Sequence, residues 1–171
     1  MKIGSAAVEL EISRQWAPGP RGLLELWQHE GARTDRAFGF FSNDDLAWCP
    51  LAPERSIGEL LVHIAHARAV TTYWLLAPMG TPPRSHSLES GVQPRAARSL
   101  LAIAGQELFR TLCDMPAERF DDPVVPFGER ETRGVMALGM LKHELHHRGE
   151  LHAYARVLGK RPVSLYAPIL N

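Results

Sequence analysis

Two histidines, His143 and His147, stand four residues apart in the segment LKHELHHRG. Side chains with this spacing lie on the same face of an α-helix, so the two imidazoles can bind one metal ion together. At about 3.6 residues per turn, the same helical face carries six more residues of this region. They are Met136, Gly139, Met140, Glu150, Tyr154 and Leu158. Because most of them are apolar or small, we expect this face, and both histidines, to point into the protein.

An inward-facing histidine pair needs partners for its ring nitrogens. A buried polar group without a partner costs about 1 to 3 kcal/mol. A shared metal ion is one solution, and hydrogen bonds to carboxylates or carbonyls are another. The spacing of the pair leaves both open. A metal site would also require a further ligand from a facing helix, because two histidines hold an ion weakly.

The composition indicates one globular domain over residues 1–171. The chain has 171 residues, of which 45% are hydrophobic, enough for a core that needs no disulfide staples. Lys and Arg together number 19, as do Asp and Glu, and no basic run is interleaved with aromatic residues. This balance argues against nucleic acid as a partner.

The cysteines and the chain start predict a cytoplasmic protein. Cys49 and Cys113 are far apart and form no CxxC motif, which is typical of a reducing compartment. The first residues mix charges with apolar side chains, unlike a signal peptide. No segment approaches the roughly 18 uncharged apolar residues that a membrane span requires. We therefore expect neither secretion nor membrane insertion.

Proline and glycine divide the chain into four segments with helical periodicity. The first predicted helix begins after APGP and ends near Ser42 to Asp45. The other three cover about 56 to 76, 94 to 115 and 132 to 159. The only strand-like pattern is the alternation Val8, Leu10, Ile12. The fold class is thus all-α, a four-helix bundle. Two connections are long, so a simple up-down-up-down order is not assured.

Two local motifs mark helix ends. After the last helix, residues 160–171 are expected to pack as a tail over the end of the bundle. Ser56 and Glu59 form a capping box, in which each side chain accepts a hydrogen bond from the other residue's backbone N–H. Gly159 follows the last helical residues and fits a glycine cap.

The second helix supplies the candidate third ligand. Its apolar residues sweep an arc that contains His63 and stops short of His66, so His63 is the inward one. On the last helix, His146 is expected at the flank of the stripe and His152 toward solvent. His29 has no clear assignment. The letters HELHH also match the HExxH pattern of zinc peptidases, but Glu144 lies about 100° round the helix from His143 and no sheet is predicted, which disfavours a peptidase.

The runs HELHHRGELHAYARVLGKRP and SIGELLVHIAHA resemble the DinB/YfiT-like metalloenzyme family, whose members are four-helix bundles. The likeness extends from the first helix to SLYAP near the end. It implies metal ligands His63, His143 and His147, the same three histidines that the helical faces favour. Glu150 stands where the family usually carries Gln. This carboxylate could orient an imidazole, bind the metal as a fourth ligand, or alter the charge offered to a substrate.

The resemblance also implies a function, a small-molecule substrate and a homodimer. Relatives include thiol-dependent transferases, which implies a metal-dependent thiol S-transferase or hydrolase, with a low-molecular-weight thiol as a further cofactor and Glu150 or Tyr154 within reach of it. The alternative is a non-catalytic, stress-induced metal-binding protein. Neutral imidazoles suit zinc, nickel or iron, and also copper.

Gly149 inside a helix costs about 1 kcal/mol against alanine, which suggests a closely packed neighbouring helix or second chain.

Overall fold

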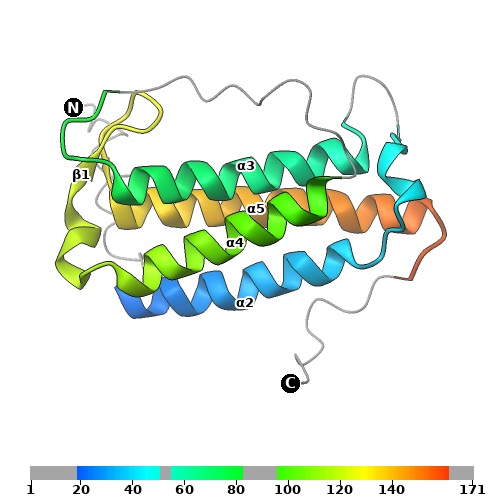
Figure 1. The fold of residues 1–171 in the computed structure, drawn as a ribbon, viewed down its shortest axis with the longest axis horizontal. Helices are drawn as coiled ribbons and strands as arrows, with labels where there is room; N and C mark the ends of the chain where they lie inside the picture. Colours follow the sequence, from blue (N-terminus) through cyan, green and yellow to red (C-terminus); the bar gives the residue numbers. More distant parts are fainter. Residues whose placement is uncertain (1–18, 51–54, 83–95, 162–171) are drawn as a thin grey trace, which may run out of the picture.

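The computed structural model describes residues 19–50, 55–82 and 96–161, and the described part is mainly helical. Its α-helices are α2 (Pro20–Phe38), α3 (Ile57–Leu76), α4 (Ala97–Asp114) and α5 (Arg133–Val157). They lie side by side in a bundle, as Figure 1 shows. Helix α3 packs against α4 and α5, and α2 packs against the same two helices. The face formed by α3 and α5 therefore lies on the opposite side of the bundle from the face formed by α2 and α4. The predicted all-α four-helix bundle is confirmed.

The helices do not simply alternate in direction. Helices α2 and α5 run one way along the bundle, while α3 and α4 both run the other way (Figure 1). The start of α4 thus lies at the opposite end of the bundle from the end of α3. Two neighbouring parallel helices require a long connection between them, which accounts for the length of chain between α3 and α4.

Most helix ends lie where the sequence predicts them. The Ser56 hydroxyl accepts from the Glu59 backbone N–H at 3.2 Å, and Glu59 Oε2 accepts from the Ser56 N–H at 2.8 Å, so the capping box is present. Gly159 adopts a φ of 71°, the left-handed conformation that a glycine cap requires. Helix α2, however, ends at Phe38, earlier than predicted. Phe41 lies beyond the end of the helix, but the chain turns after Gly39 and brings the Phe41 side chain back into the core. The regular spacing of buried apolar residues in the sequence therefore continues past the helix.

A small hairpin between α4 and α5 was expected only as a loop. A short 3-10 helix, η3 (Ala117–Asp121), leads into β1 (Pro123–Val124), which pairs antiparallel with β2 (Glu131–Thr132). Strands of two residues are too short to show a period-2 pattern, which is why the sequence did not reveal them. A second 3-10 helix, η1 (Asp44–Ala47), follows α2. The predicted strand-like residues Val8 to Ile12, Pro94 and nearly all of the predicted tail lie outside the described residues.

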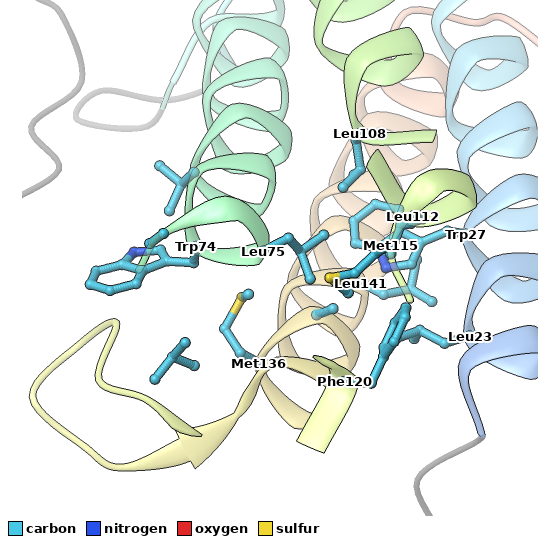
Figure 2. Packing of buried hydrophobic residues seen from close by; sticks show 14 residues of the cluster. Leu23, Trp27, Trp74, Leu75, Leu108, Leu112, Met115, Phe120, Met136 and Leu141 are labelled. Atoms are coloured by element: carbon cyan, nitrogen blue, oxygen red, sulfur yellow. The ribbon is translucent and has the colours of Figure 1, made fainter. Parts of the chain in front are cut away.

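The core consists of two apolar clusters, one at each end of the bundle. The first packs around Trp27 and Trp74 with residues of all four helices and the hairpin segment, as Figure 2 shows. The second contains Ile64 and the early turns of α3 and α4. Between them lies a set of buried polar residues, here called the polar layer. It consists of Thr34, Arg68, Thr71, Glu144, His147 and Arg148.

A fully buried arginine joins the end of α3 to the start of α5. The Arg133 guanidinium donates to the carbonyls of Trp74, Leu75 and Ala77 at 2.6, 2.9 and 2.7 Å. Carbonyls at a helix C-terminus have no partner within their own helix, so Arg133 satisfies groups that would otherwise be buried unpaired. This contact helps to fix how α5 lies along α3. Among the described helices, none combines the length and the apolar character of a membrane span.

Candidate metal centre

The three histidines selected from the sequence meet between α3 and α5. His63 Nε2 lies 3.1 Å from His143 Nε2, and His147 Nε2 lies 3.0 Å from the same His143 atom. Ligand atoms of all three side chains fall within 4.8 Å of one another. We refer to His63, His143 and His147 as the histidine cluster. The structure thus brings together residues that are 80 positions apart in the sequence.

The histidine cluster lies at the edge of the buried face of α5, which differs from the predicted direction. His147 is buried, but His63 and His143 are only partly buried, and Gly139, expected on the inward stripe, is exposed. The buried face of α5 includes Leu141 and Leu151 instead. Helix α5 packs against both α3 and α2, so its buried face is centred between those two contacts. Periodicity fixed the relative directions of the residues, but it could not fix which way the stripe points.

The ring nitrogens of the histidine cluster fit a bound cation. Desolvation lowers the pKa of His63 to about 4 and also lowers the pKa of His143, with nearby Arg55 and the other histidines acting in the same direction. Both rings are therefore neutral at neutral pH and can offer a lone pair. His143 Nε2 faces two other Nε2 atoms, and a single shared proton can bridge only one of these pairs. One metal ion can accept all three lone pairs.

Two further ring atoms bear on the alternative of hydrogen bonds to carboxylates or carbonyls. The Nδ1 atoms of His63 and His143 are buried and have no hydrogen-bond partner among the described residues. The protein therefore does not use a network of carboxylates or carbonyls to satisfy these two rings, which was the alternative left open by the spacing. Three neutral nitrogen donors form a ligand set suited to zinc and to other first-row metals.

Glu150 contacts the opposite side of the His147 ring. Its Oε2 lies 2.8 Å from His147 Nδ1, and its Oε1 lies 3.2 Å from Nε2 of the exposed His146. An acceptor at Nδ1 holds the ring proton there, which leaves the Nε2 lone pair directed into the histidine cluster. Of the three roles considered for Glu150, the geometry favours that of a group that orients an imidazole. His146, His147 and Glu150 also form a compact group of ligand types, in which Glu150 contacts both histidine rings.

Tyr154, the expected substrate contact, is partly buried one helical turn beyond Glu150. Its ring packs edge-on against Trp48, with ring centroids 5.6 Å apart and an interplanar angle of 70°. Trp48 directly follows η1, so this contact attaches the η1 segment to α5. A role for Tyr154 toward a substrate stays a prediction.

Glu144, the residue between the cluster histidines in the HExxH pattern, points into the bundle interior. It is 1% exposed and binds the Arg68 guanidinium through both carboxylate oxygens, at 2.9 and 2.7 Å. It therefore does not lie beside the metal position as a peptidase base would, in agreement with the argument against a peptidase. This ion pair was not predicted from the sequence. Its signal was Arg68, a lone charge within the apolar arc of α3.

Three other predictions for α5 concern His146, His152 and Gly149. His146 is mainly exposed, as a flank position allows. The prediction that His152 faces solvent was wrong, because it is 7% exposed and packs edge-on against Phe40 at 5.7 Å. Contact between α5 and α2 widens the buried face enough to include it. No described atom lies within 4 Å of a Cβ built on Gly149, so no neighbouring helix requires this glycine.

Comparisons with known proteins agree with the fold. The family model described as the DinB superfamily matches residues 26–151. A DinB-like protein from Bacillus subtilis, YjoA, is 18% identical with a TM-score of 0.71, and the match covers 87% of this chain and 99% of that one. A DinB-like protein from Bacillus cereus is 15% identical with a TM-score of 0.72, covering 85% and 97%.

A third solved structure is that of YfiT from Bacillus subtilis, described as a probable metal-dependent hydrolase with an unusual four-helix bundle topology. It is 14% identical with a TM-score of 0.63, and the match covers 83% of this chain and 89% of that one. No curated protein matches the chain. The identities to these solved structures are low, so they support the fold, while the family model covers well over half of the sequence. This chain therefore belongs to the DinB superfamily.

Proposed function

We propose that His63, His143 and His147 bind one divalent metal ion and that the protein is a metal-dependent enzyme acting on a small molecule. The convergence of three Nε2 atoms at a partly exposed position is the observation that carries this proposal. Zinc, nickel and iron all suit three neutral imidazoles. The family membership and the description of YfiT as a probable metal-dependent hydrolase support the metal.

The environment of the ligands favours catalysis over storage. A structural metal site is closed by four protein ligands, whereas a catalytic site keeps a position open for water or substrate. Glu150, the candidate fourth ligand, contacts the far nitrogen of His147 and so does not close the cluster. The partial exposure of His63 and His143 gives a small molecule access to the same position.

Each side chain has a defined task in this proposal. The three imidazoles hold the ion, Glu150 fixes the orientation of His147, and the Arg68–Glu144 pair holds α5 against α3. When bound, an ion with three neutral ligands acts as a Lewis acid that lowers the pKa of a water molecule or a thiol. The first case leads to hydrolysis. The second leads to thiol S-transfer with a low-molecular-weight thiol, in which Tyr154 or Glu150 would supply a hydrogen bond.

The remaining parts of the proposal are the oligomeric state, which rests on the family resemblance, and the compartment, which rests on the cysteine content and the sequence pattern. We expect a cytoplasmic homodimer, and several exposed apolar side chains, among them Ile103 and Leu26, are available for a helix-mediated interface. Light scattering tests this directly, since a monomer of about 19 kDa at micromolar concentration would contradict it. The competing function, a non-catalytic stress-induced metal-binding protein, uses the same ligands.

Elemental analysis of protein purified without a histidine tag tests the metal site. One equivalent of a divalent metal is expected in the wild type and in His29→Ala, whose exposed histidine lies on α2. His143→Ala and His147→Ala should each lose stoichiometric metal while far-ultraviolet circular dichroism stays helical. Full metal content in both variants would overturn the site.

A substrate screen then separates the two functions. Metal-loaded protein is incubated with ester substrates, and separately with common cellular thiols and a chlorinated aromatic or epoxide acceptor. Turnover that disappears in His143→Ala supports the enzyme. Metal binding without any turnover favours the non-catalytic protein.

A further inference from the structure

A pocket of about 340 Å³ opens between α2 and α4, on the opposite side of the bundle from the histidine cluster. Trp27, Leu108, Phe109 and Leu112 supply apolar and aromatic walls. Asp35 and the buried Arg68 form its charged end. None of the residues lining it belongs to the histidine cluster, so this pocket is not the entrance to the candidate metal centre.

Small residues on the facing helices make room for the pocket. Gly31 and Ala32 of α2 and Ala102 and Gly105 of α4 all line it. A Cβ on Gly105 would lie 2.6 Å from Arg68 Nη1, so glycine at this position lets the guanidinium reach from α3 to the pocket. The volume falls within the lower range of small-molecule sites, and apolar walls with a few fixed polar groups are typical of such sites.

At the charged end of the pocket, Arg68 has no free donor. Arg68 Nε and Nη2 bind Glu144, and Nη2 also contacts the Gly31 carbonyl. Its Nη1 lies 3.3 Å from the Leu101 carbonyl and 3.1 Å from Asp35 Oδ1. One guanidinium therefore faces two carboxylates, Glu144 and Asp35. An anionic ligand would find every Arg68 nitrogen already occupied and would meet an excess of negative charge.

Asp35 is the group best placed to bind a ligand. Its side chain is 53% exposed even though one oxygen contacts Arg68, so a ligand in the pocket can reach the carboxylate. Desolvation raises the pKa of Asp35; the Arg68 charge opposes this, while Glu144 adds to it. The carboxylate is thus incompletely stabilised by Arg68, which it shares with Glu144, and an added cation would stabilise it further.

We propose that this pocket binds a small primary amine that carries an apolar, aromatic body. The ammonium group pairs with Asp35, and the aromatic rings of Trp27 and Phe109, which line the part of the pocket away from Asp35, pack against the apolar body. This site is separate from the proposed metal centre, because it shares no residue with the histidine cluster.

Phenethylamine, which is protonated at neutral pH, is a suitable probe. Its binding to the full chain is measured by ligand-observed NMR and isothermal titration calorimetry, beside the neutral analogue 2-phenylethanol and the anionic analogue 3-phenylpropionate. The amine should bind at least about five times more tightly than the alcohol, and the carboxylate should bind most weakly. Equal binding of all three, or no binding of the amine, would overturn the proposal.

Variants locate the binding site. Asp35→Asn should reduce amine affinity about five- to tenfold and remove the preference over the alcohol, while Asp114→Asn, an exposed position on α4 outside the pocket, should leave both unchanged. Ala32→Leu fills the pocket and should abolish binding of all the analogues, with Ala69→Leu on the exposed face of α3 as its control. Thermal melts confirm that each variant is folded. Unchanged amine binding in Asp35→Asn and Ala32→Leu would contradict the assignment, and unchanged binding in His143→Ala would confirm independence from the metal.

Discussion

The carboxylate of Glu144 accepts two hydrogen bonds from Arg68 between the two apolar clusters of the bundle. Glu144 follows His143 directly on α5, and Arg68 lies five residues after His63 on α3. A bidentate pair between these positions allows only a narrow range of rotation and sliding of one helix against the other. The ion pair thus fixes the helix register on which the histidine cluster depends.

Removing one partner of this pair is expected to be strongly destabilising. Glu144→Leu leaves a buried guanidinium with one carboxylate fewer and should lower the free energy of unfolding by about 3 to 5 kcal/mol. The double variant Arg68→Met/Glu144→Leu replaces both charges with apolar groups and should recover much of that loss. Urea denaturation of the metal-free proteins measures both values. A double variant no more stable than Glu144→Leu alone would contradict this account.

Substitutions of Glu150 test its orienting role. Glu150→Ala removes the acceptor at His147 Nδ1 and should weaken metal affinity about 10- to 100-fold. Glu150→Gln keeps a carbonyl oxygen at that position and should weaken it much less. Competition with a chelator measures the metal affinities. Glu107→Ala, at an exposed position of α4, is the matched control. A direct fourth ligand would predict a loss of comparable size in the Gln and Ala variants.

His152 predicts a pH dependence of stability. Desolvation lowers its pKa, with Arg148 and Arg156 acting in the same direction, so the unfolded chain binds a proton more readily than the folded protein. The contribution of His152 to stability is therefore complete above its ordinary pKa of about 6.5 and decreases as the pH falls below that value. In metal-free protein, the stability difference between wild type and His152→Phe should shift in favour of the variant between about pH 7 and pH 5. A difference that stays constant over this range would contradict the prediction.

Arg133 should be essential for joining α3 to α5. Arg133→Met leaves three carbonyls at the end of α3 without a donor and should lower the free energy of unfolding by about 3 kcal/mol or more. The exposed Arg130, three residues earlier, provides the control variant Arg130→Met, which should change stability little. Chemical denaturation distinguishes the two. Equal stability of both variants would show that the buried guanidinium is not required.

The helices and the histidine cluster could be predicted from the sequence because their signals are local. The Ser56–Glu59 capping box and the i, i+4 spacing of His143 and His147 depend on a few neighbouring residues. The absolute direction of the α5 stripe could not be predicted, since it depends on how α2 and α3 share the surface of α5. For that reason His152 was assigned to solvent although it is buried.

Long-range pairing was the other limit. Arg68 and Glu144 are 76 residues apart, and each looks on its own like a surface charge that interrupts an apolar pattern. The packing of α5 beside α3 brings them together. The two-residue strands β1 and β2 are likewise defined by pairing with each other and not by any pattern within them.

We expect the polar layer to divide the bundle into two halves that open separately. Native proteins unfold locally in contiguous packed units, and the two apolar clusters are the expected units here. Backbone amides in the half around Trp74 and amides in the half around Ile64 are thus expected to exchange with solvent through different opening events. In the histidine cluster, His63 belongs to a segment of α3 in the half around Ile64. His143 and His147 lie at the boundary between the two halves. A ligand bound there would couple the two openings, and its release would let each half open independently of the other.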